Sequence, residues 1–339
     1  MSTALVARLD SAGDVLIAGP AVRAVAATHG DVVLLAGPRG RAAAEILPGV
    51  AEVVEWQAPW VDFDAPELTA DHVEGLLKRL GDIAPTHAYV LTSFHQSPLP
   101  LALLLRMAGV GWIGAISEDY PGTLLDLRHH VPPGVAEPLR ALSLVEAGGC
   151  ALPPGDDGTL RVAVPQRIPD DVAPLLGAGP YVAFHPGAAV PARRPTAERS
   201  ARMVGALVEA GHRVVVTGGP DECDLTARVA GTHAVDLGGR TDLGTLAAVF
   251  AGARAVVTPN TGPAHLAAAV GVPIVSLFAP VVPASQWAPF GPRVTILGDQ
   301  DAPCRETRAR DCPVEGHPCL DGITDAAVVS AVARWGGES

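Results

Sequence analysis

The segment from Ala255 to Phe278 reads AVVTPNTGPAHLAAAVGVPIVSLF. Its first residues, Ala255 to Val257, form a short apolar run of the kind found in buried strands. Pro263 suits the first turn of a helix, where an amide hydrogen has no partner, and Gly271 suits the position just after a helix ends. Ile274 to Phe278 is a second apolar run. The stretch is therefore predicted to form a strand, a tight turn, a helix and the next strand of a parallel sheet.

The turn before this helix has the properties of an anion site. Amide groups in the first turn of a helix lack partners, and the helix dipole adds positive charge there. Thr261 or Gly262 can cap the helix, and Gly262 lets a ligand approach the backbone closely. We therefore predict that the turn binds a diphosphate. The alternative is an ordinary connection within an α/β sheet.

The composition points to a two-domain α/β protein. A chain of 339 residues exceeds one typical core, and 48% hydrophobic residues with 4% aromatic ones are typical of domains built from Ala, Val and Leu. The formal net charge of −12 argues against non-specific binding to nucleic acid.

No targeting or transmembrane segment is expected. The amino-terminal residues lack the basic region of a signal peptide, Arg8 interrupts the first apolar run, and no stretch reaches the ~18 apolar residues of a membrane span. Five cysteines in a chain of this length do not form a disulfide framework. The expected location is the cytoplasm.

Strands alternate with helices in two series, which predicts two doubly wound parallel sheets. The first series begins with a strand over residues 3–9 and a helix over 15–28. A segment rich in proline, glycine and acid over 150–158 interrupts the pattern. We expect an N-terminal domain over 1–152, a C-terminal domain over 160–322 and a last helix within 323–339. Ligands of such folds bind at the carboxyl ends of the strands, here in a cleft between the halves.

Common nucleotide and metal motifs are absent or uninformative. No Gly-x-Gly-x-x-Gly follows the first strand, and there is no P-loop. Asp62-Phe63-Asp64 matches an Asp-x-Asp pattern that binds a metal–nucleotide in other enzymes, but a match of two carboxylates is common by chance. We predict that this segment is loop surface.

A cysteine-rich segment near the carboxyl end contains Cys304, Cys312, His317 and Cys319. It lacks the close Cys-x₂₋₄-Cys spacing of a structural zinc site. Free thiols, or a loop crosslinked only under oxidation, are expected there, with a metal site as the alternative.

Acidic side chains surround the end of the first strand. Asp10 and Asp14 flank a short turn, and Gly13 lets the backbone turn tightly. A carboxylate there points toward the ligand, and the helix N-terminus that follows keeps Asp14 ionised and able to accept a proton. The alternative role of Asp14 is to cap that helix.

Loops after two strands of the second half carry candidate ligand-binding side chains. The segment from His185 to Ala188 follows one buried strand, and Arg193 and Arg194 lie just beyond it. Adjacent arginines are commonly solvated, but beyond a strand end they can grip a phosphate. Thr217 to Glu222 follows the next strand. Its glycines allow close approach, and Glu222 either accepts hydrogen bonds from a ribose or begins a helix.

These motifs occur in a fixed order along the chain: RLDSAGDVL from Arg8, HPGA from His185, VTGGPDE from Val216, DLGGRTDL from Asp236 and TGPAHLAAA from Thr261. Together they resemble glycosyltransferase family 9, the ADP-heptose:lipopolysaccharide heptosyltransferases. The resemblance covers nearly the whole chain.

The resemblance implies a GT-B fold, in which two Rossmann-like domains face a central cleft and the last helix crosses back to the first domain. It implies an inverting transfer of a sugar from a nucleotide diphosphate-sugar, ADP-linked in this family, to an acceptor hydroxyl without a metal or cofactor. Asp14 matches the catalytic base, and Asp10, Ser11 and Gly13 lie beside the acceptor. The donor-binding positions are His185, Gly187, Arg193, Arg194, Thr217, Gly218, Gly219, Glu222, Asn260, Thr261, Gly262, Pro263 and His265.

Two departures from the family pattern bear on the donor. Asn260 stands where family members usually have Asp, and Pro195-Thr196 lacks the tryptophan usual at that place. The acceptor is either a lipopolysaccharide core, the family default, or a small soluble molecule of natural-product biosynthesis. Two other functions stay open: a sugar-nucleotide epimerase and a non-catalytic relative that binds nucleotide-sugar.

Overall fold

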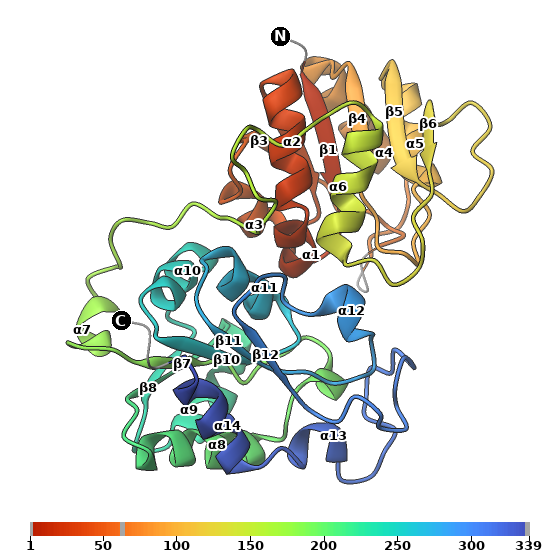
Figure 1. Cartoon of the computed structure of the whole chain (residues 1–339). Coiled ribbons are helices and arrows are strands. Elements are labelled where there is room, and N and C mark those ends of the chain that lie inside the picture. The colour runs from red at the N-terminus through yellow and green to blue at the C-terminus, as the bar shows by residue number, and fades with distance from the viewer. Residues whose placement is uncertain (1–2, 62–64, 336–339) are drawn as a thin grey trace. The chain divides into compact units, whose positions relative to one another are not determined.

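The computed structural model describes residues 3–61 and 65–335, so Asp62-Phe63-Asp64 lies outside the described residues. The chain divides into two compact units, Met1–Arg161 and Val162–Ser339. In the described part of the chain, each unit is built on one six-stranded parallel sheet (Figure 1). The prediction of two doubly wound α/β domains is therefore confirmed.

The sheet of the first unit has the strand order β3-β2-β1-β4-β5-β6. The strands are β1 Ala4–Arg8, β2 Val32–Ala36, β3 Val50–Glu55, β4 His87–Val90, β5 Trp112–Ile116 and β6 Leu127–His129. In a sheet of this order the chain reverses its direction of travel between β1 and β4. The carboxyl ends of these two strands therefore border the crevice in which ligands of doubly wound folds bind.

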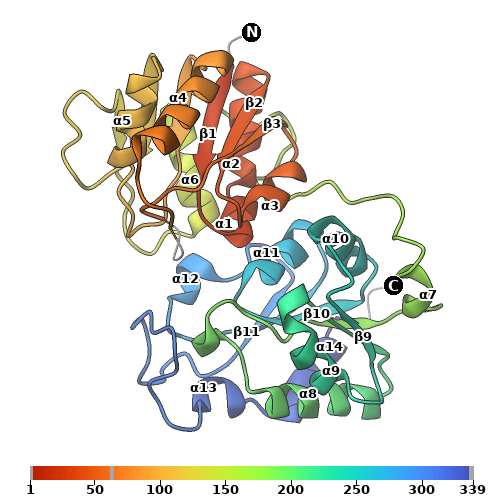
Figure 2. The same cartoon turned by 180° about the vertical axis from the view of Figure 1, so that it is seen from behind.

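Helices cover both faces of this sheet. They are α1 Ala12–Ile17, α2 Gly19–His29, α3 Arg41–Glu45, α4 Ala70–Ile83, α5 Leu99–Met107 and α6 Glu137–Ala147. Helices α2 and α6 pack together on one face, and α4 and α5 pack together on the other (Figures 1 and 2). The single helix predicted over 15–28 is wrong. The helix is interrupted at Ala18, and a second helix begins at Gly19-Pro20, because proline starts a helix more readily than it continues one.

The sheet of the second unit repeats the same order, β12-β11-β10-β7-β8-β9. The strands are β7 Val182–Phe184, β8 Val214–Gly218, β9 Val235–Gly238, β10 Ala255–Pro259, β11 Ile274–Leu277 and β12 Val294–Leu297. Read from β9, this is again the doubly wound order, with the reversal between β7 and β10. The segments that leave β7 and β10 are therefore the ones expected to meet a ligand.

The helices of this unit also lie on two faces. They are α7 Ala173–Leu176, η1 Pro191–Arg193, α8 Ala197–Glu209, η2 Pro220–Glu222, α9 Cys223–Ala230, α10 Leu243–Ala251, α11 Gly262–Ala269, α12 Ala284–Trp287, α13 Pro318–Asp321 and α14 Asp325–Ala333. Helices α10 and α11 pack together, as do α8, α9 and α14 (Figures 1 and 2). The last helix, α14, is held on α8 by an ion pair from Arg199 to Asp325 and by buried Val328 and Val332. Its expected return to the N-terminal domain stays a prediction.

An ion pair ties the segment after residue 152 to helix α2 of the first unit. The Arg23 side chain of α2 donates to both carboxylate oxygens of Asp156, at 2.6 and 2.9 Å, and to the Thr159 carbonyl at 2.8 Å. These bonds tie the predicted linker to α2, so the division between the units falls after Arg161.

Candidate active site

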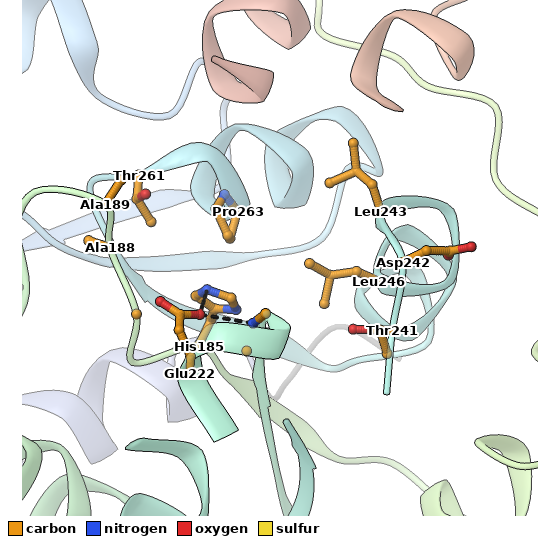
Figure 3. A pocket seen from close by; sticks show the side chains of 13 residues that line it. His185, Ala188, Ala189, Glu222, Thr241, Asp242, Leu243, Leu246, Thr261 and Pro263 are labelled. Carbon is orange, nitrogen blue, oxygen red and sulfur yellow. Dashed lines mark hydrogen bonds and ion pairs between the residues drawn. The ribbon is translucent and has the colours of Figure 1, made fainter. Parts of the chain in front are cut away.

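A cavity of about 290 Å³ lies at the carboxyl edge of the second sheet (Figure 3). Its walls come from the segments that follow β7, β8, β9 and β10. The lining residues are His185, Gly187, Ala188, Ala189, Gly218, Gly219, Glu222, Thr241, Asp242, Leu243, Leu246, Thr261 and Pro263. Seven of them are among the donor-binding positions predicted from the sequence: His185, Gly187, Gly218, Gly219, Glu222, Thr261 and Pro263.

His185 is a buried, neutral side chain in the cavity wall. Its Nδ1 lies 3.0 Å from the Thr217 hydroxyl, and its Nε2 lies 3.7 Å from a carboxylate oxygen of Glu222. Burial lowers the pKa of His185 to about 4, although the charge of Glu222 acts in the opposite direction. The imidazole is therefore uncharged near pH 7, and it offers the cavity hydrogen-bonding capacity without a positive charge.

Glu222 presents a carboxylate to the same cavity. Its Oε2 accepts a hydrogen bond of 2.9 Å from the Gly219 amide, which fixes the side chain at the start of α9. A Cβ at position 187 would clash with this carboxylate, so Gly187 provides the space that Glu222 occupies. Figure 3 shows Glu222 and His185 facing each other across this part of the wall. The segments that follow β7 and β8 thus contribute neighbouring side chains to this wall.

The N-terminus of α11 keeps one open amide. The Thr261 amide donates to the Pro259 carbonyl at 2.9 Å, and the Ala264 amide donates to the Thr261 carbonyl at 3.0 Å. Pro263 has no amide hydrogen. Within residues 3–61 and 65–335, neither the Gly262 amide nor the Thr261 hydroxyl has a protein partner. These two donors are therefore available to an anion at the mouth of the helix.

Asn260 is turned away from the cavity and into the protein. Its side chain is buried, and both ends of its amide contact the backbone of Ala279. His265 is likewise buried within α11, and neither residue lines the cavity.

The structure does not bring the two predicted arginines to this cavity. Arg193 ends η1, and Arg194 lines a separate cavity of about 440 Å³ together with Arg228 and His317. The walls of the first cavity hold neither arginine nor lysine among the described residues. The groups in these walls that can stabilise an anion are a backbone amide, a hydroxyl and the dipole of α11.

The carboxyl end of β1 carries a cluster of buried charges in the first unit. The Arg8 side chain, the last of β1, donates to Asp14 at 3.0 Å and to the Ser93 hydroxyl at 2.9 Å. Its Nε also lies 3.0 Å from Asp10, as an ion pair without the alignment of a hydrogen bond. Gln96 donates to the other oxygen of Asp10 at 2.6 Å. Ser93 and Gln96 follow β4, so this cluster bridges the point where the strand order reverses.

Asp14 caps its own helix and still reaches the surface. The Ser11 hydroxyl donates to Asp14 at 2.6 Å, and the Ser11 amide donates at 3.2 Å, which forms a capping box. Gly13 is buried in the same turn of α1. The Asp14 side chain is 19% exposed, whereas that of Asp10 is 10% exposed. Asp14 is therefore the more accessible of the two acids.

Comparisons with known proteins agree with this architecture. Residues 149–317 match glycosyltransferase family 9 (heptosyltransferase). The second half of this chain therefore carries a domain that is similar to glycosyltransferase family 9. The chain is 30% identical over 158 residues to lipooligosaccharide heptosyltransferase 2 of Haemophilus influenzae, and the match covers 44% of this chain and 45% of that protein. The chain therefore spans less than half the length of this curated relative. The resemblance inferred from the sequence motifs is confirmed.

Two solved structures share the fold of the whole chain. The glycosyl transferase family 9 protein from Veillonella parvula superposes with a TM-score of 0.80 at 16% identity, over 98% of this chain and 97% of that one. The Escherichia coli heptosyltransferase WaaC with ADP superposes with a TM-score of 0.72 at 19% identity, over 98% and 99% of the two chains.

The cavity of the family 9 domain includes a wall that sequence reasoning missed. Leu243 and Leu246 of α10 supply apolar surface, and Thr241 and Asp242 precede them. Asp242 caps α10 by accepting a 2.7 Å hydrogen bond from the Thr245 amide, and this bond lowers the pKa of Asp242. The signal was present in the sequence, because an acid before an apolar helical run marks a helix start at the carboxyl end of a strand.

Glu137 and Arg140 of α6 are two further charged residues near this cluster that no sequence motif indicated. Glu137 is buried, 3.6 Å from Arg140, and its Oε1 accepts no hydrogen bond within the described residues. Burial raises the pKa of Glu137, and the charges of Arg8 and Arg140 oppose that shift. Burial likewise raises the pKa of Asp10 against the charge of Arg8. The acids around Arg8 are therefore held in a poorly solvated environment.

The cysteine-rich segment brings three thiols together. Cys304 and Cys319 are buried, and burial together with the neighbouring Cys304 and Cys312 raises the pKa of Cys319 to about 12. Among the described residues, no group of histidine, cysteine or acidic side chains has the arrangement of a metal site. Of the helices within residues 3–61 and 65–335, none combines the length and apolar character needed to cross a bilayer.

Proposed function

We propose that this protein is an inverting glycosyltransferase that moves a sugar from an ADP-linked donor to an acceptor hydroxyl without a metal. The observation that carries the proposal is the coincidence of the family 9 match with a cavity at the reversal point of the second sheet. A curated relative of the matched part is a heptosyltransferase, and one solved relative holds ADP, so the proposed donor is an ADP-heptose or a related ADP-sugar.

The cavity offers a place for each part of ADP. Leu243 and Leu246 form an apolar surface suited to a nucleobase, and the anchored Glu222 carboxylate can accept hydrogen bonds from ribose hydroxyls. The diphosphate then lies at the N-terminus of α11, on the Gly262 amide and the Thr261 hydroxyl. Negative charge grows on the leaving diphosphate during transfer, so these dipoles stabilise the transition state more than the ground state.

Asp14 serves as the general base in this proposal. It accepts the proton of the acceptor hydroxyl while that oxygen bonds to the anomeric carbon from the face opposite the diphosphate, and the bond from that carbon to the diphosphate oxygen breaks. Arg8 and Ser11 donate to its two carboxylate oxygens and so orient the group. Asp10, Ser11 and Gly13 surround the position of the acceptor. The proposed location of the reaction is the cytoplasm.

The acceptor is either a lipopolysaccharide core or a small soluble molecule. An assay of ADP release from ADP-heptose tests the proposed function, with and without each acceptor class. Release that depends on an acceptor, with a new glycosidic product, is the expected result. Release of a free sugar without acceptor indicates an epimerase or hydrolase, and binding of ADP with no turnover for any acceptor indicates a non-catalytic relative. Failure to bind ADP overturns the proposal.

A further inference from the structure

We infer that Asn260 is a positioning residue that holds the anion-binding turn of α11 in place by clamping the backbone of Ala279. This inference rests on the proposed function, because it concerns the turn on which the diphosphate lies. The feature that carries it is a pair of hydrogen bonds. The Ala279 amide donates to the Asn260 side-chain oxygen at 3.1 Å, and the Asn260 side-chain nitrogen donates to the Ala279 carbonyl at 3.4 Å.

The orientation of this amide is determined by its partners. Rotating the group by half a turn would place its NH₂ against the Ala279 amide and its oxygen against the Ala279 carbonyl, and both contacts would then be repulsive. Ala279 is fully buried and Asn260 is 5% exposed, so neither backbone group can turn to water instead. An unpaired buried amide or carbonyl costs roughly as much as the bond it has lost.

The two hydrogen bonds between Asn260 and Ala279 lie just beyond the last residue pair of the sheet. The last paired residues of β10 and β11 are Pro259 and Leu277, and beyond them the chain leaves β10 to begin α11. Asn260 is the first residue past this pair, and its side chain continues the connection to the segment after β11. Thr261, which follows directly, occupies the N-cap position of α11 and carries the open hydroxyl. The position of the turn is thus set by an amide outside the cavity.

An aspartate cannot reproduce this contact. Its ionised carboxylate accepts from the Ala279 amide but places a second oxygen, negatively charged, beside the Ala279 carbonyl. Asn260 therefore acts through the turn, and its replacement should weaken diphosphate binding while the nucleoside part of the cavity stays intact.

The test compares ADP with adenosine by calorimetry on the full chain, using the wild type, N260D and N260A. The wild type should bind ADP more tightly than adenosine. Both variants should lose about tenfold in affinity for ADP, the size expected for losing one or two hydrogen bonds, with unchanged affinity for adenosine. Equal ADP affinity in all three proteins, or a parallel loss for adenosine, overturns the inference.

A ligand-free readout separates this inference from the proposed function. The Ala279 amide hydrogen should exchange faster with solvent in N260A than in the wild type, and unchanged exchange rejects the clamp even where ADP binds. A wild type that binds neither ligand rejects the proposed function, whereas faster exchange in N260A would still support the clamp. Q300A is the matched control, because the Gln300 amide donates to the neighbouring Phe278 carbonyl at 2.8 Å and to the Gly298 carbonyl at 3.4 Å. It should leave the ADP affinity unchanged.

Discussion

Arg8 donates a hydrogen bond of 3.0 Å to Asp14 from the last position of β1, although the two residues belong to a strand and to the next helix. The pair is flanked by Asp10 and by Glu137, whose charges together with Asp14 raise the pKa of Arg8 against the effect of its burial. The guanidinium is thus fixed in the protein interior, and it directs the carboxylate of Asp14 from one side.

Removing the charge of Asp14 should abolish transfer without affecting the donor. The substitution D14N keeps the shape of the side chain but removes the group that takes the acceptor proton. We expect kcat to fall by roughly 10²–10⁴, the usual contribution of general base catalysis, with the affinity for ADP unchanged. Steady-state kinetics and calorimetry measure the two quantities. The control S11A removes only the hydrogen bond from the Ser11 hydroxyl to Asp14, and it should lower kcat far less than D14N does. Turnover by D14N at the wild-type rate would exclude Asp14 as the base.

The buried acids of the first unit should make stability depend on pH. Burial raises the folded-state pKa of Glu137, so the folded protein binds its proton more tightly than the unfolded chain does. The resulting stability is present at pH values below the unfolded pKa and is lost as the pH rises through the folded pKa. E137Q should therefore flatten the fall in the free energy of unfolding over that range, as followed by urea denaturation. E146Q on the exposed face of α6 is the control, and identical pH profiles for E137Q and the wild type would contradict this account.

Adding one methyl group at Gly187 should displace Glu222. A Cβ there clashes with the Glu222 carboxylate, which is the mobile end of a side chain, so the carboxylate moves and the backbone keeps its place. G187A should therefore reduce ADP affinity by about tenfold, as expected when a charged hydrogen-bonding group is displaced, and change the thermal midpoint little. G205A in α8, where a Cβ meets no atom within 4 Å, is the matched control. A large fall in the thermal midpoint of G187A with intact ADP affinity would show that Glu222 has no part in binding.

Much of this fold could be predicted from periodicity. The buried strands β1, β7, β8, β10 and β11 are short apolar runs followed by turn residues, and these runs predict strands at all five places. The edge strand β6 is not predicted, because Leu127–His129 carries two polar side chains and no apolar run. The other edge strand, β12 Val294–Leu297, is also not predicted, although three of its four residues are apolar. The helix break at Gly19-Pro20 was also missed, since an apolar pattern continued across it.

The site was predictable where it depends on residues next to a strand end. His185, Glu222, Thr261 and Asp14 follow such ends, and the structure places them at carboxyl edges of the two sheets. The positions of Arg194 and Asn260 were not predictable in the same way. Each depends on which way a side chain leaves the backbone, and this is decided by distant partners such as Ala279. Glu137 lies far from β1 in sequence, so its approach to Arg8 had no local signal.

The proposed function requires the N-terminus of α11 to bind the diphosphate of the donor. The most direct measurement is a calorimetric titration of the wild type and T261V with ADP, AMP and adenosine. The account predicts that wild-type affinity falls in that order, and that T261V loses about tenfold for ADP while its affinity for adenosine is unchanged. Equal affinity of the wild type for ADP and adenosine, or a T261V protein that binds ADP as tightly as the wild type, would contradict it.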